Sequence, residues 1–160
     1  MKSFKAHDDW ISYLLFVDNF KLISCSADKK IKIWNSINFE CQIELENHLD
    51  AIYYLDVTSD GRLLSCSEDK TIKIWQIKTG EMLESIQFEK AIHCFKILND
   101  DLISVETDED QIEIVNLNTI ETIKTISSNI TFVYCFHLLS NGNMLSGSQN
   151  GEIKLWKLFE

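Results

Sequence analysis

Two sets of histidine, serine and aspartate recur in this chain at one spacing. His7, Ser24 and Asp28 precede Trp34 at the same intervals at which His48, Ser65 and Asp69 precede Trp75. These residue types carry out nucleophilic hydrolysis when one exposed serine faces an oxyanion site. Because the same set occurs twice, each time beside a tryptophan, a structural role is favoured and no catalytic residue is predicted.

Both sets belong to a longer repeat. Near-identical phrases end at four positions: SADKKIKIW at Trp34, SEDKTIKIW at Trp75, TDEDQIEIV at Val115 and SQNGEIKLW at Trp156. The phrases recur at a nearly constant interval of about 40 residues, which indicates an array of one small structural unit. Arrays of this kind mostly present surfaces, and few of them carry out bond chemistry.

Each unit is predicted to hold four short antiparallel strands. In the second unit, β-branched and aromatic runs between turn residues predict strands at 51–57, 62–67, 71–77 and 82–88. The first unit follows the same plan at 10–16, 21–26, 31–34 and 41–46. One such meander cannot bury both of its faces, so neighbouring units must stack.

The composition limits the classes of partner. The chain has 25 acidic and 15 basic residues, a net charge of −10, which disfavours binding to the phosphates of nucleic acid. A basic peptide or protein patch is favoured instead, and plain solubility is the alternative explanation for the charge. No apolar run is long enough to cross a bilayer, and the N-terminus does not resemble a secretory signal.

The cysteines and histidines predict neither a disulfide framework nor a metal site. None of the five cysteines forms a C-x-x-C pair, and Cys25 and Cys66 share one slot in successive units. Reduced thiols in the core of a cytoplasmic protein are therefore expected. His93 and His137 show no metal spacing, and no phosphate-binding loop occurs, so no cofactor is predicted.

The repeat resembles the WD40 repeat, the blade unit of the β-propeller. The resemblance covers residues 1–160 and implies an all-β fold of four four-stranded antiparallel blades, with repeats at about 6–46, 47–87, 88–128 and 129–160. It also implies that four polar side chains staple each blade by hydrogen bonds. Two complete staples match: His7, Ser24, Asp28 and Trp34, and His48, Ser65, Asp69 and Trp75. A buried imidazole and a buried indole both require such partners.

The third and fourth repeats depart from this pattern. The third has Phe88 or Glu89, Ser104, Asp108 and Val115 at the four positions, and the fourth has Asn129, Ser146, Asn150 and Trp156. These blades are predicted to lack the staple and to depend on apolar packing. We expect them to open more readily than the first two blades.

The two ends of the chain are in complementary phase. The last repeat stops after its third strand, and residues 1–5 occupy the slot of an outer strand. The resemblance implies that this N-terminal strand completes the last blade, in the same chain or in a partner chain. We favour a homodimer with eight blades; a closed four-bladed monomer and a piece of a longer propeller are the alternatives.

In propellers of this type, partners often dock on the face ringed by the loops before each first strand. By position, that face carries an aromatic cluster and an acidic rim: Trp10, Tyr53, His93, Phe132 and Tyr134, with Glu68 and the nearby Asp108, Glu109 and Asp110. Aromatic anchors and a carboxylate suit a lysine or arginine side chain. The alternatives are that Tyr53 and Phe132 belong to the core and that the acidic loop is a solvated turn.

The sequence therefore predicts a non-catalytic scaffold that presents an aromatic and acidic face to a protein or peptide. A purely structural, self-assembling element, or a fragment of a larger WD40 protein, is the alternative. An enzyme is not favoured, because the sequence offers no isolated acid–base pair and no metal cluster.

Overall fold

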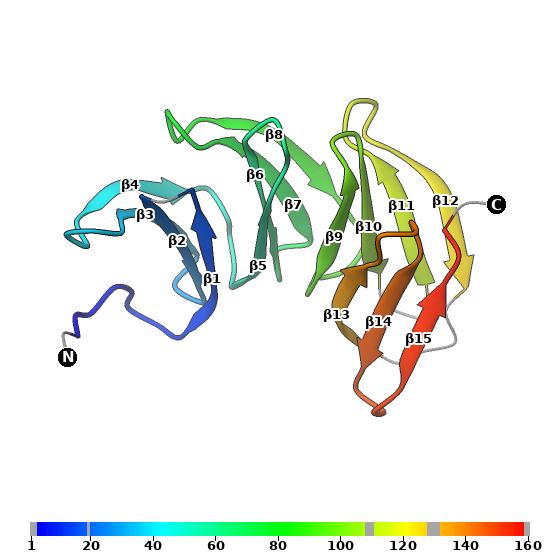
Figure 1. Ribbon diagram of the computed structural model, residues 1–160. Helices are drawn as coiled ribbons and strands as arrows, with labels where there is room; N and C mark the ends of the chain where they lie inside the picture. Colours follow the sequence, from blue (N-terminus) through cyan, green and yellow to red (C-terminus); the bar gives the residue numbers. More distant parts are fainter. Residues whose placement is uncertain (1–2, 19, 108–110, 128–131, 159–160) are drawn as a thin grey trace.

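The computed structural model describes residues 3–18, 20–107, 111–127 and 132–158. Within these ranges, every regular element is a β-strand, and the strands form four separate antiparallel sheets. The sheets stand side by side as the blades of a propeller (Figure 1). We number the blades from 1 to 4 in chain order. The expected all-β propeller fold is confirmed.

The first two blades have four strands each, in the order of the sequence. Blade 1 contains β1 (Ile11–Val17), β2 (Lys21–Ser26), β3 (Lys30–Asn35) and β4 (Cys41–Glu46). Blade 2 contains β5 (Ile52–Val57), β6 (Arg62–Ser67), β7 (Thr71–Gln76) and β8 (Met82–Gln87). These bounds differ from the predicted strands by no more than a single residue at either end.

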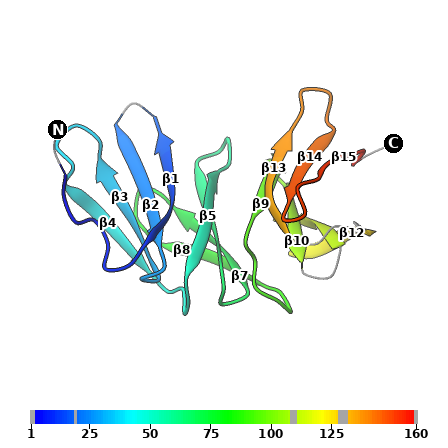
Figure 2. The ribbon, with the colours of Figure 1, turned by 90° about the horizontal axis from the view of Figure 1, so that it is seen from below.

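The remaining two blades repeat this meander with one strand fewer in the last. Blade 3 contains β9 (Phe95–Asn99), β10 (Leu102–Thr107), β11 (Gln111–Asn116) and β12 (Glu121–Ser127). Blade 4 contains β13 (Val133–Leu138), β14 (Met144–Ser148) and β15 (Ile153–Trp156), so its sheet has three strands among the described residues. The first strands β1, β5, β9 and β13 line the inner side of the arrangement (Figures 1 and 2).

The core lies between the blades, because each sheet has two apolar faces. We call the side toward the preceding blade the front face and the other side the back face. The back face of blade 1 packs on the front face of blade 2, and their side chains form one buried cluster: Ile23, Cys25, Ile31, Ile33 and Leu45 with Ile52, Leu55, Leu63, Trp75 and Ile77. Two further clusters join blade 2 to blade 3 and blade 3 to blade 4 in the same way.

The four blades form an open arc, with the two ends of the chain at its opposite extremes (Figures 1 and 2). The N-terminal segment therefore does not complete blade 4 of its own chain, which corrects the same-chain version of that expectation. The segment lies against blade 1 instead, where the Phe4 ring packs on Trp34 with centroids 5.4 Å apart. The four blades of this chain therefore do not close into a ring by themselves (Figures 1 and 2), which corrects the alternative of a closed four-bladed monomer.

Candidate functional site

The two staples form as continuous chains of hydrogen bonds. In blade 2, His48 Nδ1 lies 2.7 Å from Asp69 Oδ2, His48 Nε2 lies 2.7 Å from Ser65 Oγ, and Trp75 Nε1 donates to the same hydroxyl at 2.8 Å. The indole can only donate, so the serine proton goes to His48 Nε2, and the imidazole donates from Nδ1–H to the aspartate. All of these polar groups are therefore satisfied inside the blade.

Blade 1 repeats this arrangement. His7 Nδ1 lies 2.9 Å from Asp28 Oδ2, and His7 Nε2 lies 2.6 Å from Ser24 Oγ, to which Trp34 Nε1 donates at 2.9 Å. Ser24 and Ser65 are buried, so neither hydroxyl is available to a substrate. The two sets do not have the geometry of a hydrolytic site, which needs an exposed nucleophile.

The pKa directions in blade 2 agree with this protonation pattern. Burial lowers the pKa of His48 even though Asp69 opposes it. Burial raises the pKa of Asp69, but hydrogen bonds from His48, Thr71 and the Leu49 N–H outweigh it and hold that pKa well below its ordinary value. Both directions describe a neutral imidazole that donates to an ionised carboxylate.

The staple is reduced in blades 3 and 4, though not to the same extent. In blade 4, Trp156 Nε1 still donates to Ser146 Oγ at 2.8 Å, so half of the staple persists there. In blade 3, Val115 replaces the indole, and Ser104 Oγ lies 3.1 Å from Met144 Sδ of blade 4. Asn150, at the aspartate position of blade 4, stays within its own hairpin, where its Oδ1 accepts from Ser148 Oγ and from the Glu152 N–H. Asp108 and Asn129 lie outside the described residues.

One edge of the molecule carries four aromatic rings, one from each blade. The ring centroid of Trp10 lies 6.1 Å from that of Tyr53, Tyr53 lies 4.8 Å from His93, and His93 lies 5.9 Å from Phe132. We call Trp10, Tyr53, His93 and Phe132 the aromatic row. Tyr134 is exposed in β13 and, within the described part of the chain, makes no ring contact with the row.

β-Bulges near the start of three inner strands each leave one residue unpaired, and one of these residues, Tyr53, belongs to the aromatic row. The register shifts between Ile52 and Tyr54 in β5, which leaves Tyr53 unpaired, and the same shift leaves Ser12 unpaired in β1 and Tyr134 in β13. A bulge turns the side chain of the extra residue away from the regular alternation. Residue spacing assigned Tyr53 and Tyr134 to this face, but it did not predict the bulges.

Glu68 is the acidic member of the site. Its Oε2 accepts a hydrogen bond from the Tyr53 hydroxyl at 2.9 Å and lies 3.8 Å from His93 Nε2. Burial and the adjacent Glu68 raise the pKa of Tyr53 to about 12, so the phenol remains a donor at neutral pH. The carboxylate is exposed and can accept further donors, whereas Asp108, Glu109 and Asp110 lie outside the described residues.

The alternative that the aromatic residues are core side chains holds in part. Tyr53 is half-buried and packs against the cluster between blades 2 and 3. Trp10 is 54% exposed and Phe132 is 41% exposed, although both contact a neighbouring ring. In the middle of the row, Tyr53 is packed against the core, whereas Trp10 and Phe132 at its ends are exposed.

Two further features of the described residues bear on other functions. No group of three histidine, cysteine, aspartate or glutamate side chains in these ranges could hold a metal ion. In the same ranges, no helix has the length and hydropathy to span a membrane.

The sequence pattern of one family, described as "WD domain, G-beta repeat" (WD40), matches residues 1–35, 39–76 and 120–157, which is more than half of the chain. The chain belongs to the WD40 family. The longest unmatched stretch, 77–119, contains most of the third repeat, where Val115 stands in the place of the tryptophan. WD40 propellers are generally non-catalytic, bind proteins or peptides, and typically serve as interaction scaffolds.

Among solved structures, the chain is similar to the WD40 β-propeller domain of Doa1. The TM-score is 0.87 at 24% sequence identity, and the match covers 98% of this chain and 53% of that chain. The chain therefore spans about half the length of this WD40 relative. At this identity, the likeness is evidence for the fold alone.

Proposed function

We propose that the chain is a non-catalytic interaction scaffold, and that the aromatic row with Glu68 binds a basic side chain of a peptide or protein partner. The observation that carries the proposal is the row itself. Four rings from four blades stand in sequence across one edge, with centroid separations between 4.8 and 6.1 Å. Buried contacts between blades do not require aromatic side chains at this exposed edge.

The electrostatics of the site support a cationic ligand. Glu68 lies beside Tyr53 and His93, and the chain carries a net charge of −10. A guanidinium or ammonium group is stabilised both by an aromatic ring beneath it and by a carboxylate next to it. The overall charge accelerates encounter with a basic partner, and this contribution weakens as salt is added.

Fluorescence anisotropy with labelled peptides tests this function. The probes are short peptides of equal length that carry arginine, lysine, glutamine or glutamate at the central position. Trp10→Ala and Glu68→Lys should each weaken binding of the arginine or lysine peptide by about tenfold or more, as expected for a hot-spot residue.

Matched controls are available on the opposite edge. Phe20 is 59% exposed at the far end of β1, and Glu40 is exposed before β4. Phe20→Ala and Glu40→Lys should leave peptide binding unchanged. The proposal is wrong if basic peptides bind no better than acidic ones, or if the control substitutions weaken binding as much as those in the row.

A second candidate function, a self-assembling element, is favoured by a different observation. The front face of blade 1 and the back face of blade 4 are both apolar, and neither has a neighbouring blade. These surfaces do not include Tyr53, Glu68 or His93, so the two functions are compatible and can be tested separately.

A further inference from the structure

The two ends of the arc are the two halves of an interface that the chain already forms three times. Each internal interface joins the back face of one blade to the front face of the next. Blade 1 has no blade before it, and blade 4 has none after it (Figure 1). Exposed residues of blades 1 and 4 can therefore be compared with the residues that occupy the same repeat positions in the buried internal interfaces.

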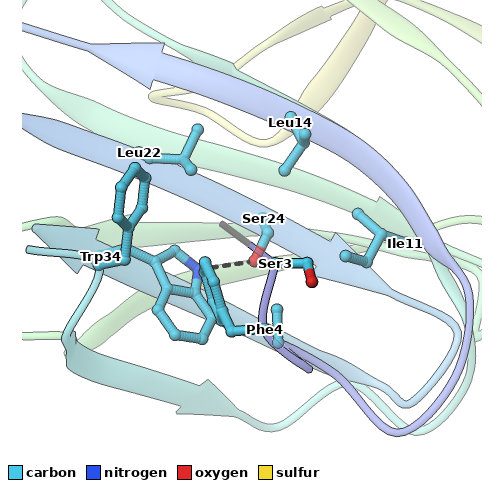
Figure 3. Close-up of a pocket in the computed structure, with 9 residues that line it drawn as sticks. Ser3, Phe4, Ile11, Leu14, Leu22, Ser24 and Trp34 are labelled. Carbon is cyan, nitrogen blue, oxygen red and sulfur yellow. Dashed lines mark hydrogen bonds between the residues drawn. The ribbon is translucent and has the colours of Figure 1, made fainter. Parts of the chain in front are cut away.

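The front face of blade 1 carries the front-face residues of the repeat, left uncovered. Leu14 and Ile11 occupy the slots that Leu55 and Ile52 hold one repeat later, and the later pair is fully buried against blade 1. In blade 1 the same slots are 56% and 43% exposed. They line an apolar hollow together with Leu22, Trp34 and Phe4 (Figure 3).

The N-terminal segment already occupies the place of an outer strand from a preceding blade. Phe4 has the slot that Leu45 takes one repeat later, and Leu45 lies on β4 and shares a buried cluster with Trp75 of the next blade. Phe4 packs on Trp34, the equivalent of Trp75, and Lys32 Nζ holds the segment by donating to the Ala6 carbonyl at 2.9 Å. Within the described residues, the segment pairs with no strand. It occupies the place of an outer strand but belongs to none of the described sheets.

Blade 4 shows the opposite deficiency, a sheet without its outer strand. β15 pairs with β14 alone among the described strands. On its back face, Ile153 and Leu155 are 79% and 55% exposed. The residues one repeat earlier, Ile112 and Ile114, are fully buried against blade 4.

We infer that the back face of blade 4 docks on the front face of blade 1 of a second copy of this chain. The second copy is the occupant because each copy carries both halves of the interface in the register of the three internal ones. A two-fold arrangement covers both ends of both arcs at once and closes into a ring of eight blades. In that ring, the N-terminal segment of one copy lies at the open edge of β15 of the other and supplies the missing strand.

Light scattering on the purified chain tests this assembly. A single copy has a mass of 18.6 kDa, and the expected particle has twice that mass at micromolar and higher concentrations. Leu14→Lys and Leu155→Lys each alter a different half of the interface, and each should return the mass to that of one copy. Both side chains are exposed in the single chain, so neither substitution removes a core contact.

Leu49→Lys is the matched control. Leu49 is 79% exposed on the connection between blades 1 and 2, away from both ends of the arc. Leu49→Lys makes the same change of side chain and charge as the other two substitutions, and the doubled mass should persist in this variant. Far-UV circular dichroism should show the same strand content in all three variants.

Three outcomes overturn the inference. One is a single-copy mass at every concentration, which would leave the open ends to another protein or to further blades of a longer chain. Another is a mass that keeps rising with concentration, because that indicates open chains rather than a closed pair. The last is a doubled mass that survives both Leu14→Lys and Leu155→Lys.

Discussion

The imidazole of His93 stacks on the phenol ring of Tyr53, with the ring centroids 4.8 Å apart and an angle of 24° between the planes. The two residues come from neighbouring blades, so the contact joins blade 2 to blade 3 at the exposed edge. Tyr53 also donates to Glu68. The middle of the aromatic row is therefore both a structural contact and part of the proposed binding surface, whereas Trp10 at its end is mostly exposed.

This difference predicts opposite profiles for Trp10→Ala and Tyr53→Ala. Loss of the half-buried Tyr53 ring should lower the free energy of unfolding by about 2 kcal/mol, because its contacts with His93 and the neighbouring cluster disappear. Trp10→Ala should cost less than about 1 kcal/mol, since most of that ring faces solvent. Urea titrations followed by circular dichroism measure both. Equal losses of stability would mean that the row is core throughout.

The Ser65 hydroxyl is the central group of the blade 2 staple, and its removal should be costly. Ser65→Ala leaves the Trp75 N–H without an acceptor and His48 Nε2 without a donor inside the blade. Two orphaned buried groups should lower the free energy of unfolding by about 3 kcal/mol. Chemical denaturation followed by tryptophan fluorescence provides the measurement.

Ser104→Ala is the control for that substitution. Ser104 occupies the same slot in blade 3 and is equally buried, and among the described residues its hydroxyl has two polar partners, the Met144 sulfur and, at 3.5 Å, the Lys96 carbonyl. Because these are weak interactions, we expect a cost below about 1 kcal/mol. A cost as large as that of Ser65→Ala would show that the staple adds nothing beyond an ordinary buried serine.

The staples and the strands could be predicted from the sequence because it contains two complete copies of the same residue pattern. His48, Ser65, Asp69 and Trp75 each have an equivalent one repeat earlier, so two copies of one pattern reinforce each other. The aromatic row followed from the same register, except that Tyr134 does not join it. The bulge at Tyr53 could not be predicted, because it depends on how β5 meets β6 and not on residue type alone.

Features at the ends of the array were harder to predict, since a terminal repeat has a neighbour on one side only. Residues 1–5 were predicted to supply an outer strand, whereas among the described residues this segment pairs with no strand, and Phe4 packs on Trp34 of the same chain. The half staple of blade 4 was also missed. The sequence showed the loss of histidine and aspartate, whereas the bond from Trp156 to Ser146 needs only the two residues that remain.

The protonation pattern of blade 2 predicts that the protein loses stability in acid. Burial holds the pKa of His48 below its ordinary value of 6.5, so below that pH the unfolded chain binds a proton that the folded chain does not. The free energy of unfolding should fall as the pH drops from 6.5. The pKa of Asp69 is also lowered, from an ordinary value of 3.8, so its contribution is lost only below that pH.

Urea titrations between pH 8 and pH 5 would measure the histidine contribution. His48→Gln removes the titrating group but keeps a polar side chain, and should flatten the dependence in this window. A wild-type protein that becomes more stable as the pH falls from 6.5 to 5 would contradict the assigned neutral imidazole.

Two glycines with similar backbone angles should respond differently to alanine. Gly80 has a φ of 76°, and a Cβ there would lie 2.7 Å from Ile43 Cγ2 and 3.0 Å from Leu45 Cδ2 of blade 1. Gly142 has a φ of 80° with nothing within 4 Å of the same position. Gly142→Ala should cost about 1 kcal/mol from backbone strain alone, and Gly80→Ala about 2–3 kcal/mol, because blade 1 must also shift. Thermal unfolding midpoints that fall equally would show that the close approach is not a constraint.

Cys135 reports directly on whether a second copy covers blade 4. Its equivalent in blade 3, Cys94, is buried and lies 3.3 Å from the Val133 carbonyl of the next blade, whereas Cys135 is exposed. Labelling of Cys135 by a thiol reagent, relative to the exposed Cys41 on β4, should therefore slow as protein concentration rises. Burial raises the pKa values of Cys66 and Cys94, so these thiols should stay unlabelled in the folded protein and react only in urea.

The Leu155→Lys variant separates protection by a second copy from any slow opening of blade 4. In this variant the labelling ratio of Cys135 to Cys41 should be high and independent of concentration, because the docking surface next to Cys135 is lost. A ratio that falls with concentration in both proteins would point to non-specific association through another face. A labelling ratio that stays the same at all concentrations of the wild-type protein would mean that no second copy covers Ile153 and Leu155 on blade 4.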